Sequence, residues 1–245
     1  MTSAASAIPA TNRRIEDWFV GLALLLLVVG FAPTFYLKPV FEAGKPLTLL
    51  VIAHGVTTTA WIVVFAFQYF AVNAGSRERH KTVGVIGAVL FGLVVALSLV
   101  TAVARVASAS PQVSGPAPLI GLAYPFWVLF EVTLFGIGAL ASVRRPEWHR
   151  HFQFAGFFSF IAPATARALR FVVPAGPIVT YGSLLISILL YVGATRLKDV
   201  RSGRISRAAV VALGIQFLTL LLLFFSLDGA SLWLQFASAL TGYPQ

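Results

Sequence analysis

Residues 208–227 read AAVVALGIQFLTLLLLFFSL, and this run contains no charged side chain. The hydrocarbon core of a bilayer is about 30 Å thick, so one helical crossing needs roughly 20 apolar residues. The whole chain shares this character, because 58% of its 245 residues are hydrophobic, 11% are charged and the mean hydropathy is +0.89. Soluble domains carry about 25% charged residues. The sequence therefore predicts an integral membrane protein.

Other apolar runs of similar length precede this one, and helix-breaking residues such as Lys38-Pro39, Ser110-Pro111 and Arg145-Pro146 separate them. We therefore predict an all-α, polytopic membrane helical bundle with seven transmembrane helices in a single domain, residues 1–245. The predicted spans are approximately 18–36, 47–72, 83–106, 117–143, 152–173, 178–195 and 208–227. Glycines in GVIGAVLFG, residues 84–92, favour close packing between helices.

The basic residues predict the orientation of these spans, because short cytoplasmic loops are enriched in Lys and Arg. When the segments between spans are assigned alternately to the two sides of the membrane, one side receives only two basic residues, Lys38 and Lys45. We therefore expect a cytoplasmic N-terminus and an external C-terminus in a bacterial cytoplasmic (inner) membrane. Residues 230–241 are too short to span, and their apolar stripe predicts a short helix on the outer surface. The cytoplasmic side carries Arg13, Arg14, Arg77, Arg79, Lys81, Arg144, Arg145, Arg150, Arg196, Lys198, Arg201, Arg204 and Arg207.

The net charge of +10 does not predict a nucleic-acid partner. The basic residues are spread over short loops as topology signals and form no continuous patch. The expected partner is the lipid bilayer, with a quinone or another membrane protein complex as further candidates.

Ionisable residues inside the predicted spans are the strongest functional signal, because charges in a bilayer are rare and mark binding sites or proton pathways. At 1.5 Å per residue, His54, Glu131 and Arg167 come within about one helical turn of each other in depth. Gln68 shares a helical face with His54, and Tyr124 shares one with Glu131. We expect one polar cavity for a ligand, quinone or proton, lined by His54, Glu131, Arg167, Arg170, Tyr124 and Gln68.

The same residues also allow a purely structural interpretation. Glu131 and Arg167 would form an ion pair, because either charge alone in the membrane is far more costly than a facing pair. His54 would then bond a neighbouring carbonyl, and Arg170 would extend outward to the membrane surface.

The remaining histidines lie where predicted spans begin. His149 and His151 occur in RRPEWHRHFQF, residues 144–154, and His80 occurs in SRERHKTVG, residues 76–84. The chain contains no cysteine, so a metal would be held by His or carboxylate. Imidazoles from spans 83–106 and 152–173 are therefore candidate ligands of haem or another metal. The alternative is that these histidines are ordinary interfacial residues that bind nothing.

Three stretches carry a resemblance to known proteins: AHGVTTTAWIVVFAFQ (53–68), SRERHKTVGVIGAVLFG (76–92) and RRPEWHRHFQFAGFFSFIAPATARALR (144–170). They resemble a bacterial family of predicted membrane proteins described as a domain of unknown function. They also look like a reduced form of the two-haem transmembrane cytochromes b. That resemblance implies an inner haem b held by His80 with His149 or His151, and an outer site at His54. Span 117–143 departs from the pattern because it contains no histidine.

Several classes of protein are excluded because the sequence lacks the residues that they require. No lysine for a retinal Schiff base lies in spans 178–195 or 208–227, and no Walker, His-Glu-x-x-His or Gly-x-Ser-x-Gly motif occurs. Catalytic residues are therefore not predicted. The most specific expectation is electron transfer through b-type haem or quinone. The alternative is a non-enzymatic accessory subunit of a membrane complex, or a small-ligand or ion transporter.

Overall fold

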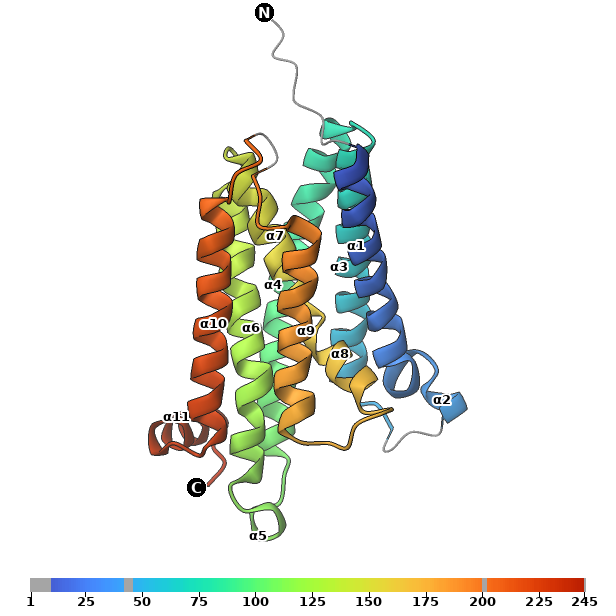
Figure 1. Ribbon diagram of the computed structural model, residues 1–245. Coiled ribbons are helices and arrows are strands. Elements are labelled where there is room, and N and C mark those ends of the chain that lie inside the picture. The colour runs from blue at the N-terminus through green and yellow to red at the C-terminus, as the bar shows by residue number, and fades with distance from the viewer. Residues whose placement is uncertain (1–9, 42–45, 200–201, 245) are drawn as a thin grey trace, which may run out of the picture. The chain divides into compact units, whose positions relative to one another are not determined.

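The computed structural model describes residues 10–41, 46–199 and 202–244, and these residues form helices and no strand. Within them, six helical segments are long and apolar enough to cross a membrane (Figure 1). The prediction of an all-α chain built mainly from such helices is confirmed. Lys45 and Arg201, which contribute to the predicted orientation, lie outside the described residues. The six segments are Arg14–Tyr36, Leu49–Asn73, Arg77–Ala107, Ala117–Ala141, Pro177–Thr195 and Arg207–Leu227.

The predicted span 152–173 is divided into two shorter helices, α7 (Pro146–Phe160) and α8 (Ala162–Leu169), which meet at Ile161. Pro163 lies in the first turn of α8 and has no N–H. The carbonyl of Ser159 therefore cannot accept the hydrogen bond that residue 163 would donate in a continuous α-helix. Neither helix alone has the roughly 20 residues that one crossing needs.

The chain forms two compact units, and each is described by itself. The first consists of the described residues of Met1–Ala43 and Phe130–Phe224, and the second of those of Gly44–Leu129 and Phe225–Gln245. Two long helices, α6 (Ala117–Ala141) and α10 (Arg207–Leu227), contribute residues to both units.

In the first unit, α8 packs against both α1 and α9, and these two also contact each other (Figure 1). Glycine allows the closest approaches. A Cβ at Gly30 would lie 2.1 Å from the backbone oxygen of Ala164, and one at Gly193 would lie 2.2 Å from the ring of Phe19. The helices outside α7 and α8 are α1 (Ala10–Phe31), the π-helix η1 (Ala32–Tyr36), α2 (Lys38–Phe41), α9 (Pro177–Thr195) and the shares of α6 and α10.

Helix α7 forms the core of the first unit. An unbroken series from Phe154 to Ser159 is buried, so side chains on every side of the helix are covered by protein. Phe157 and Phe158 are fully buried, as is Phe135 of α6. A helix buried all round belongs at the centre of a bundle rather than at its lipid-facing surface.

The second unit is built around a hairpin of α3 (Leu49–Asn73) and α4 (Arg77–Ala107). The predicted role of the glycines is confirmed at two positions. A Cβ at Gly84 would lie 3.3 Å from the Gln68 amide nitrogen, and one at Gly87 would lie 3.2 Å from Val64.

The predicted C-terminal helix is present as α11 (Ser231–Thr241), in the same unit as the short α5 (Pro111–Ser114). The indole nitrogen of Trp233 donates to the carbonyl of Leu119 at 2.9 Å, and the Tyr243 hydroxyl donates to the carbonyl of Gly115 at 2.9 Å. The first bond attaches α11 to the beginning of α6, and the second attaches the residues after α11 to the end of α5.

Candidate functional site

Glu131 lies near the middle of α6 and is only 3% exposed. The Ser159 hydroxyl of α7 donates to its carboxylate, and the Thr219 side chain of α10 also bonds it. The amide of Gln216 in α10 donates to the Ser159 oxygen at 3.3 Å. Two helices, α7 and α10, therefore contribute neutral polar groups around a buried carboxyl on a third, α6.

A cavity of about 10 Å³ adjoins this cluster. That volume is about the minimum needed for one water molecule. Gln216 is only 1% exposed, and its side-chain oxygen accepts no hydrogen bond from the protein. A water in the cavity would therefore find both an acceptor and a nearby carboxyl. The cavity is lined by Glu131, Ser159, Leu184, Ser187, Ile188, Gln216 and Leu220.

The break between α7 and α8 lies beside the carboxyl. Ser159 contacts Glu131 and is followed at Ile161 by the end of α7. Because Pro163 donates no hydrogen bond, the backbone carbonyl of Ser159 is left without its usual helical partner. The site thus combines a buried acid, side-chain hydroxyls and irregular backbone.

Arg167 does not form the ion pair with Glu131 that its depth suggested. The Arg167 guanidinium donates to the carbonyl of Pro163 at 2.9 Å and lies over the Phe31 ring, 4.6 Å from its centroid. Arg170 is the C-cap residue of α8. Within the described residues, the ion pair that the structure records joins Glu16 and Arg150 instead.

The Glu16–Arg150 pair connects the beginning of α1 to α7. Glu16 is 3% exposed, and the Arg150 guanidinium also lies 5.1 Å from the centroid of the Phe154 ring. Sequence reasoning missed this pair because Arg150 was assigned to the cytoplasmic basic residues and Glu16 precedes the predicted span 18–36. The sequence did contain a signal for this pair, because an acid, Glu16, lies near the beginning of one helix and a base, Arg150, lies near the beginning of another.

His151 is fully buried beside this ion pair, and both ring nitrogens are engaged. Nδ1 lies 3.0 Å from the Tyr191 hydroxyl and Nε2 lies 3.3 Å from the carbonyl of Lys198. A carbonyl only accepts, so Nε2 carries the proton and Nδ1 accepts from Tyr191. His151 precedes the predicted span 152–173, and burial together with the Arg150 charge lowers its pKa to about 4. An iron ligand at this position would first have to give up one of these bonds.

His149 has a different environment. Its Nδ1 lies 2.8 Å from the carbonyl of Ala139, so the ring donates from Nδ1 to the end of α6. Histidines that bind metals usually donate the other ring nitrogen to a carbonyl or carboxylate. His149 therefore has the geometry of a candidate ligand, although the described residues contain no group of three or more His, Asp or Glu suited to a metal ion.

The other predicted site residues belong to the second unit. His54 of α3 lies 3.5 Å from the Ser98 hydroxyl of α4 through Nδ1. Gln68 lies farther along α3, His80 lies in the first turn of α4, and Tyr124 lies in the first half of α6. The structure therefore places Glu131, Arg167, Arg170, His149 and His151 in the first unit, and His54, Gln68, His80 and Tyr124 in the second.

Comparisons of the chain with protein-family models, with curated proteins and with solved structures find no match. The functional conclusion therefore depends on the geometry of the site itself.

Proposed function

We propose that this chain is a multi-pass protein of a bacterial cytoplasmic membrane that moves protons, alone or with a small solute, through the site around Glu131. One observation carries the proposal. A carboxyl within an apolar helix is almost completely buried, and its partners are the hydroxyls of Ser159 and Thr219 rather than a cation. An ionised carboxylate without a counter-charge loses several kcal/mol on leaving water. A proton or a bound cation supplies the missing charge, as at the intramembrane acids of pumps and transporters.

The broken helix beside Glu131 supports the same function. In many transporters the coupling-ion site lies deep in the membrane, where a discontinuous helix exposes backbone carbonyls. Here α7 ends and α8 begins within a few residues of Ser159. The unpartnered oxygen of Gln216 provides an acceptor for a water that passes a proton to or from the acid.

The first test is infrared spectroscopy of the purified protein across a pH series. The difference between the infrared spectra of the wild type and of Glu131→Gln should show the carbonyl stretch of a protonated carboxylic acid. Ser159→Ala should shift that band, because it removes a hydrogen bond to the acid. Glu78→Gln is the matched control, since Glu78 is an exposed acid at the start of α4. If no acid band is lost in Glu131→Gln at any pH, Glu131 does not bind a proton.

The second test measures transport. Vesicles that contain the protein and a trapped pH-sensitive dye should change their internal pH under an imposed membrane potential faster than protein-free vesicles. Glu131→Gln should fall to the background rate, and Glu78→Gln should not. Equal rates in wild type and Glu131→Gln would exclude proton movement through this acid.

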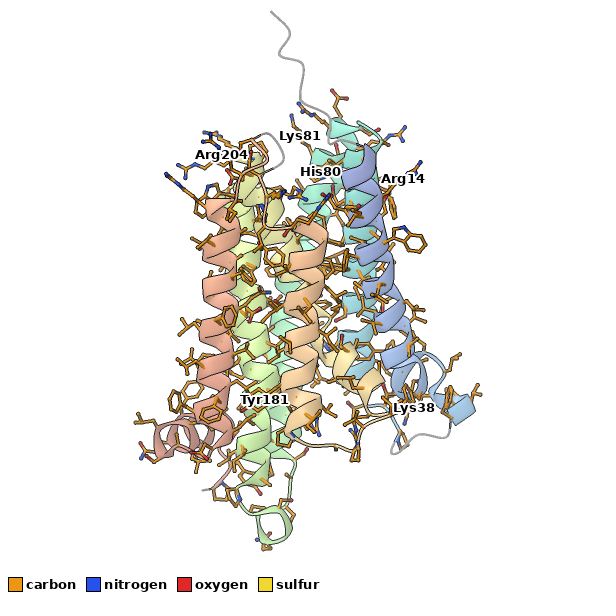
Figure 2. The ribbon with its side chains drawn as sticks, viewed as in Figure 1. Arg14, Lys38, His80, Lys81, Tyr181 and Arg204 are labelled. Atoms are coloured by element: carbon orange, nitrogen blue, oxygen red, sulfur yellow. The ribbon has the colours of Figure 1, made fainter. Side chains whose placement is uncertain are left out.

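The proposed topology has seven crossings, with α7 and α8 together forming the fifth. Arg150 meets Glu16 near the start of α1, whereas Ala164 meets Gly30 near its end. The α7–α8 segment therefore contacts α1 near both of its ends. Figure 2 places Arg14 and Arg204 at one end of the first unit and Lys38 at the other, as expected for a cytoplasmic N-terminus. Reporter fusions after Gly75, Arg145 and Ser202 should report cytoplasm, and one after Asp228 the outside.

Electron transfer through b-type haem is a second candidate, and the His149 bond to the carbonyl of Ala139 favours it. The visible spectrum of protein from haem-replete cells provides the test. Soret and alpha bands should sharpen on reduction with dithionite and vanish in His149→Ala. His151→Gln should retain them, because the bonds of His151 are already committed to Tyr191 and Lys198. A colourless protein would exclude this candidate.

A further inference from the structure

An open groove of about 490 Å³ lies at the basic end of the first unit, where α6 turns into α7. Two exposed arginines, Arg144 and Arg145, form its charged edge, and Trp148 and Phe152 form an aromatic wall. The volume falls within the range of small-molecule binding sites, roughly 300–1,000 Å³. The groove is separate from the Glu131 cavity, with which it shares no lining residue.

The groove has a defined shape because small residues line its floor. Gly138 allows the Phe152 ring to lie against α6, since a Cβ there would come within 2.7 Å of that ring. Trp148 then packs edge-on against Phe152, with ring centroids 5.5 Å apart. The hydroxyl of Ser142 is bonded to the carbonyl of Gly138 at 2.7 Å. The Ser142 hydroxyl is therefore already bonded to the backbone of α6, and the lining apart from the two arginines is mostly apolar.

The electrostatic character of the groove is cationic. The acid nearest in sequence, Glu147, accepts a hydrogen bond from the Ser206 hydroxyl and does not line the groove. Arg144 and Arg145 are thus the charged groups of its lining. Leu134 and Ile137 of α6 are 40% and 58% exposed, and Val143, in the turn that follows α6, is 60% exposed. An apolar surface therefore accompanies the arginines along α6.

From this combination we propose that the groove binds an anionic phospholipid. Its headgroup phosphate would lie against Arg144 and Arg145, its glycerol region against Trp148, and an acyl chain along the exposed apolar side of α6. Basic pockets at membrane surfaces recognise anionic headgroups, and tryptophan concentrates at the same depth. Arginine also matches phosphate by donating two parallel hydrogen bonds.

Native mass spectrometry of the delipidated full-length protein tests the proposal, with phosphatidylglycerol and phosphatidylcholine of identical acyl chains as probes. The wild type should bind phosphatidylglycerol with the lower Kd. One basic residue at a membrane surface strengthens such binding roughly fivefold. Arg144→Gln/Arg145→Gln should therefore raise the Kd for phosphatidylglycerol roughly 25-fold and leave that for phosphatidylcholine nearly unchanged.

The matched control is Arg14→Gln/Arg204→Gln, which removes two exposed charges from the same end but outside the groove. It should change the Kd less than about threefold, because distant surface charges are screened. Trp148→Leu provides a second variant and should weaken both lipids alike. The proposal is overturned if the groove variant binds phosphatidylglycerol like wild type, or if the control loses as much. Competition by millimolar inorganic phosphate would also overturn it, since the site would then select a free anion.

Discussion

Glu16 and Glu131 are equally buried in the first unit, at 3% exposure each, but the protein neutralises them by different means. Glu16 is bonded to the guanidinium of Arg150, whereas Glu131 is bonded to hydroxyls. A fixed cation turns a buried acid into a structural connection, because either partner alone would be an uncompensated charge. Under the function proposed above, a proton or bound cation supplies the charge that the neutral partners of Glu131 lack. The partners of an intramembrane acid, more than its burial, therefore indicate its role.

The largest expected effect is that of Arg150→Met, which leaves Glu16 buried without its cation. Breaking a buried ion pair from one side costs about 3–5 kcal/mol of unfolding free energy. Unfolding in detergent with a chemical denaturant measures the loss. The double variant Glu16→Gln/Arg150→Met should recover much of it, because removing both charges is often nearly neutral. A double variant as unstable as the sum of its singles would mean that the two residues are not coupled.

A smaller loss is expected for Ser159→Ala. The substitution removes the hydroxyl that donates to Glu131 and accepts from Gln216. A buried polar group left without its partner costs about 1–3 kcal/mol. Ser187→Ala is the control, because Ser187 lines the same cavity but donates to the carbonyl of Ser183 in its own helix. Equal losses in the two variants would show that Ser159 has no special connection to Glu131.

The pH dependence of stability should report on His151, beside the Glu16–Arg150 pair. Its folded-state pKa of about 4 lies below the unfolded value of 6.5, so the unfolded chain binds the proton more readily. Stability is therefore greatest above pH 6.5 and falls as the pH is lowered from 6.5 towards 4. The melting temperature should drop by a few degrees over this interval. The His151→Gln variant should show a flatter dependence of melting temperature on pH. If the His149→Gln variant flattened it equally, the effect could not be assigned to His151.

The smallest effect on stability is expected for Glu131→Gln. The amide oxygen of Gln can accept from Ser159, and no cation is left unpaired, so the change in unfolding free energy should stay below about 1 kcal/mol. The same denaturant titration measures it. Glu16→Gln is the direct comparison and should be several times more destabilising, because it strands Arg150. Similar losses in both variants would remove the distinction between the two acids.

The apolar runs predicted six of the helices well, because the thickness of the bilayer sets their length. The main boundary errors lie at the starts of α1 and α4, which begin at Ala10 and Arg77 rather than at residues 18 and 83. Arg, Glu and Lys are good helix formers, so a helix continues past the apolar run that hydropathy detects. The break at Ile161 was not predicted, although Pro163 was present in the sequence as its physical cause.

The candidate site was predicted only in part. Glu131 could be identified because an acid in an apolar run is costly, but Ser159, Gln216 and Thr219 carry little penalty and give no comparable signal. Depth predicted that Arg167 would pair with Glu131. Depth does not determine the direction in which a side chain leaves its helix, and Arg167 lies instead over Phe31. The assignment of His80, with His149 or His151, as haem ligands is still a prediction.

The close contact between α1 and α8 also limits how the sequence can change during evolution. At Gly30 the obstacle is the backbone oxygen of Ala164, which no change of rotamer can move, so any side chain there would force the two helices apart. At Gly21, on the same helix, a Cβ would meet nothing within 4 Å. Among descendants of a common ancestor, position 30 should therefore remain glycine while position 21 drifts to alanine and larger residues. A single surviving lineage with a branched residue at position 30 would show that α1 and α8 can separate without loss of the protein.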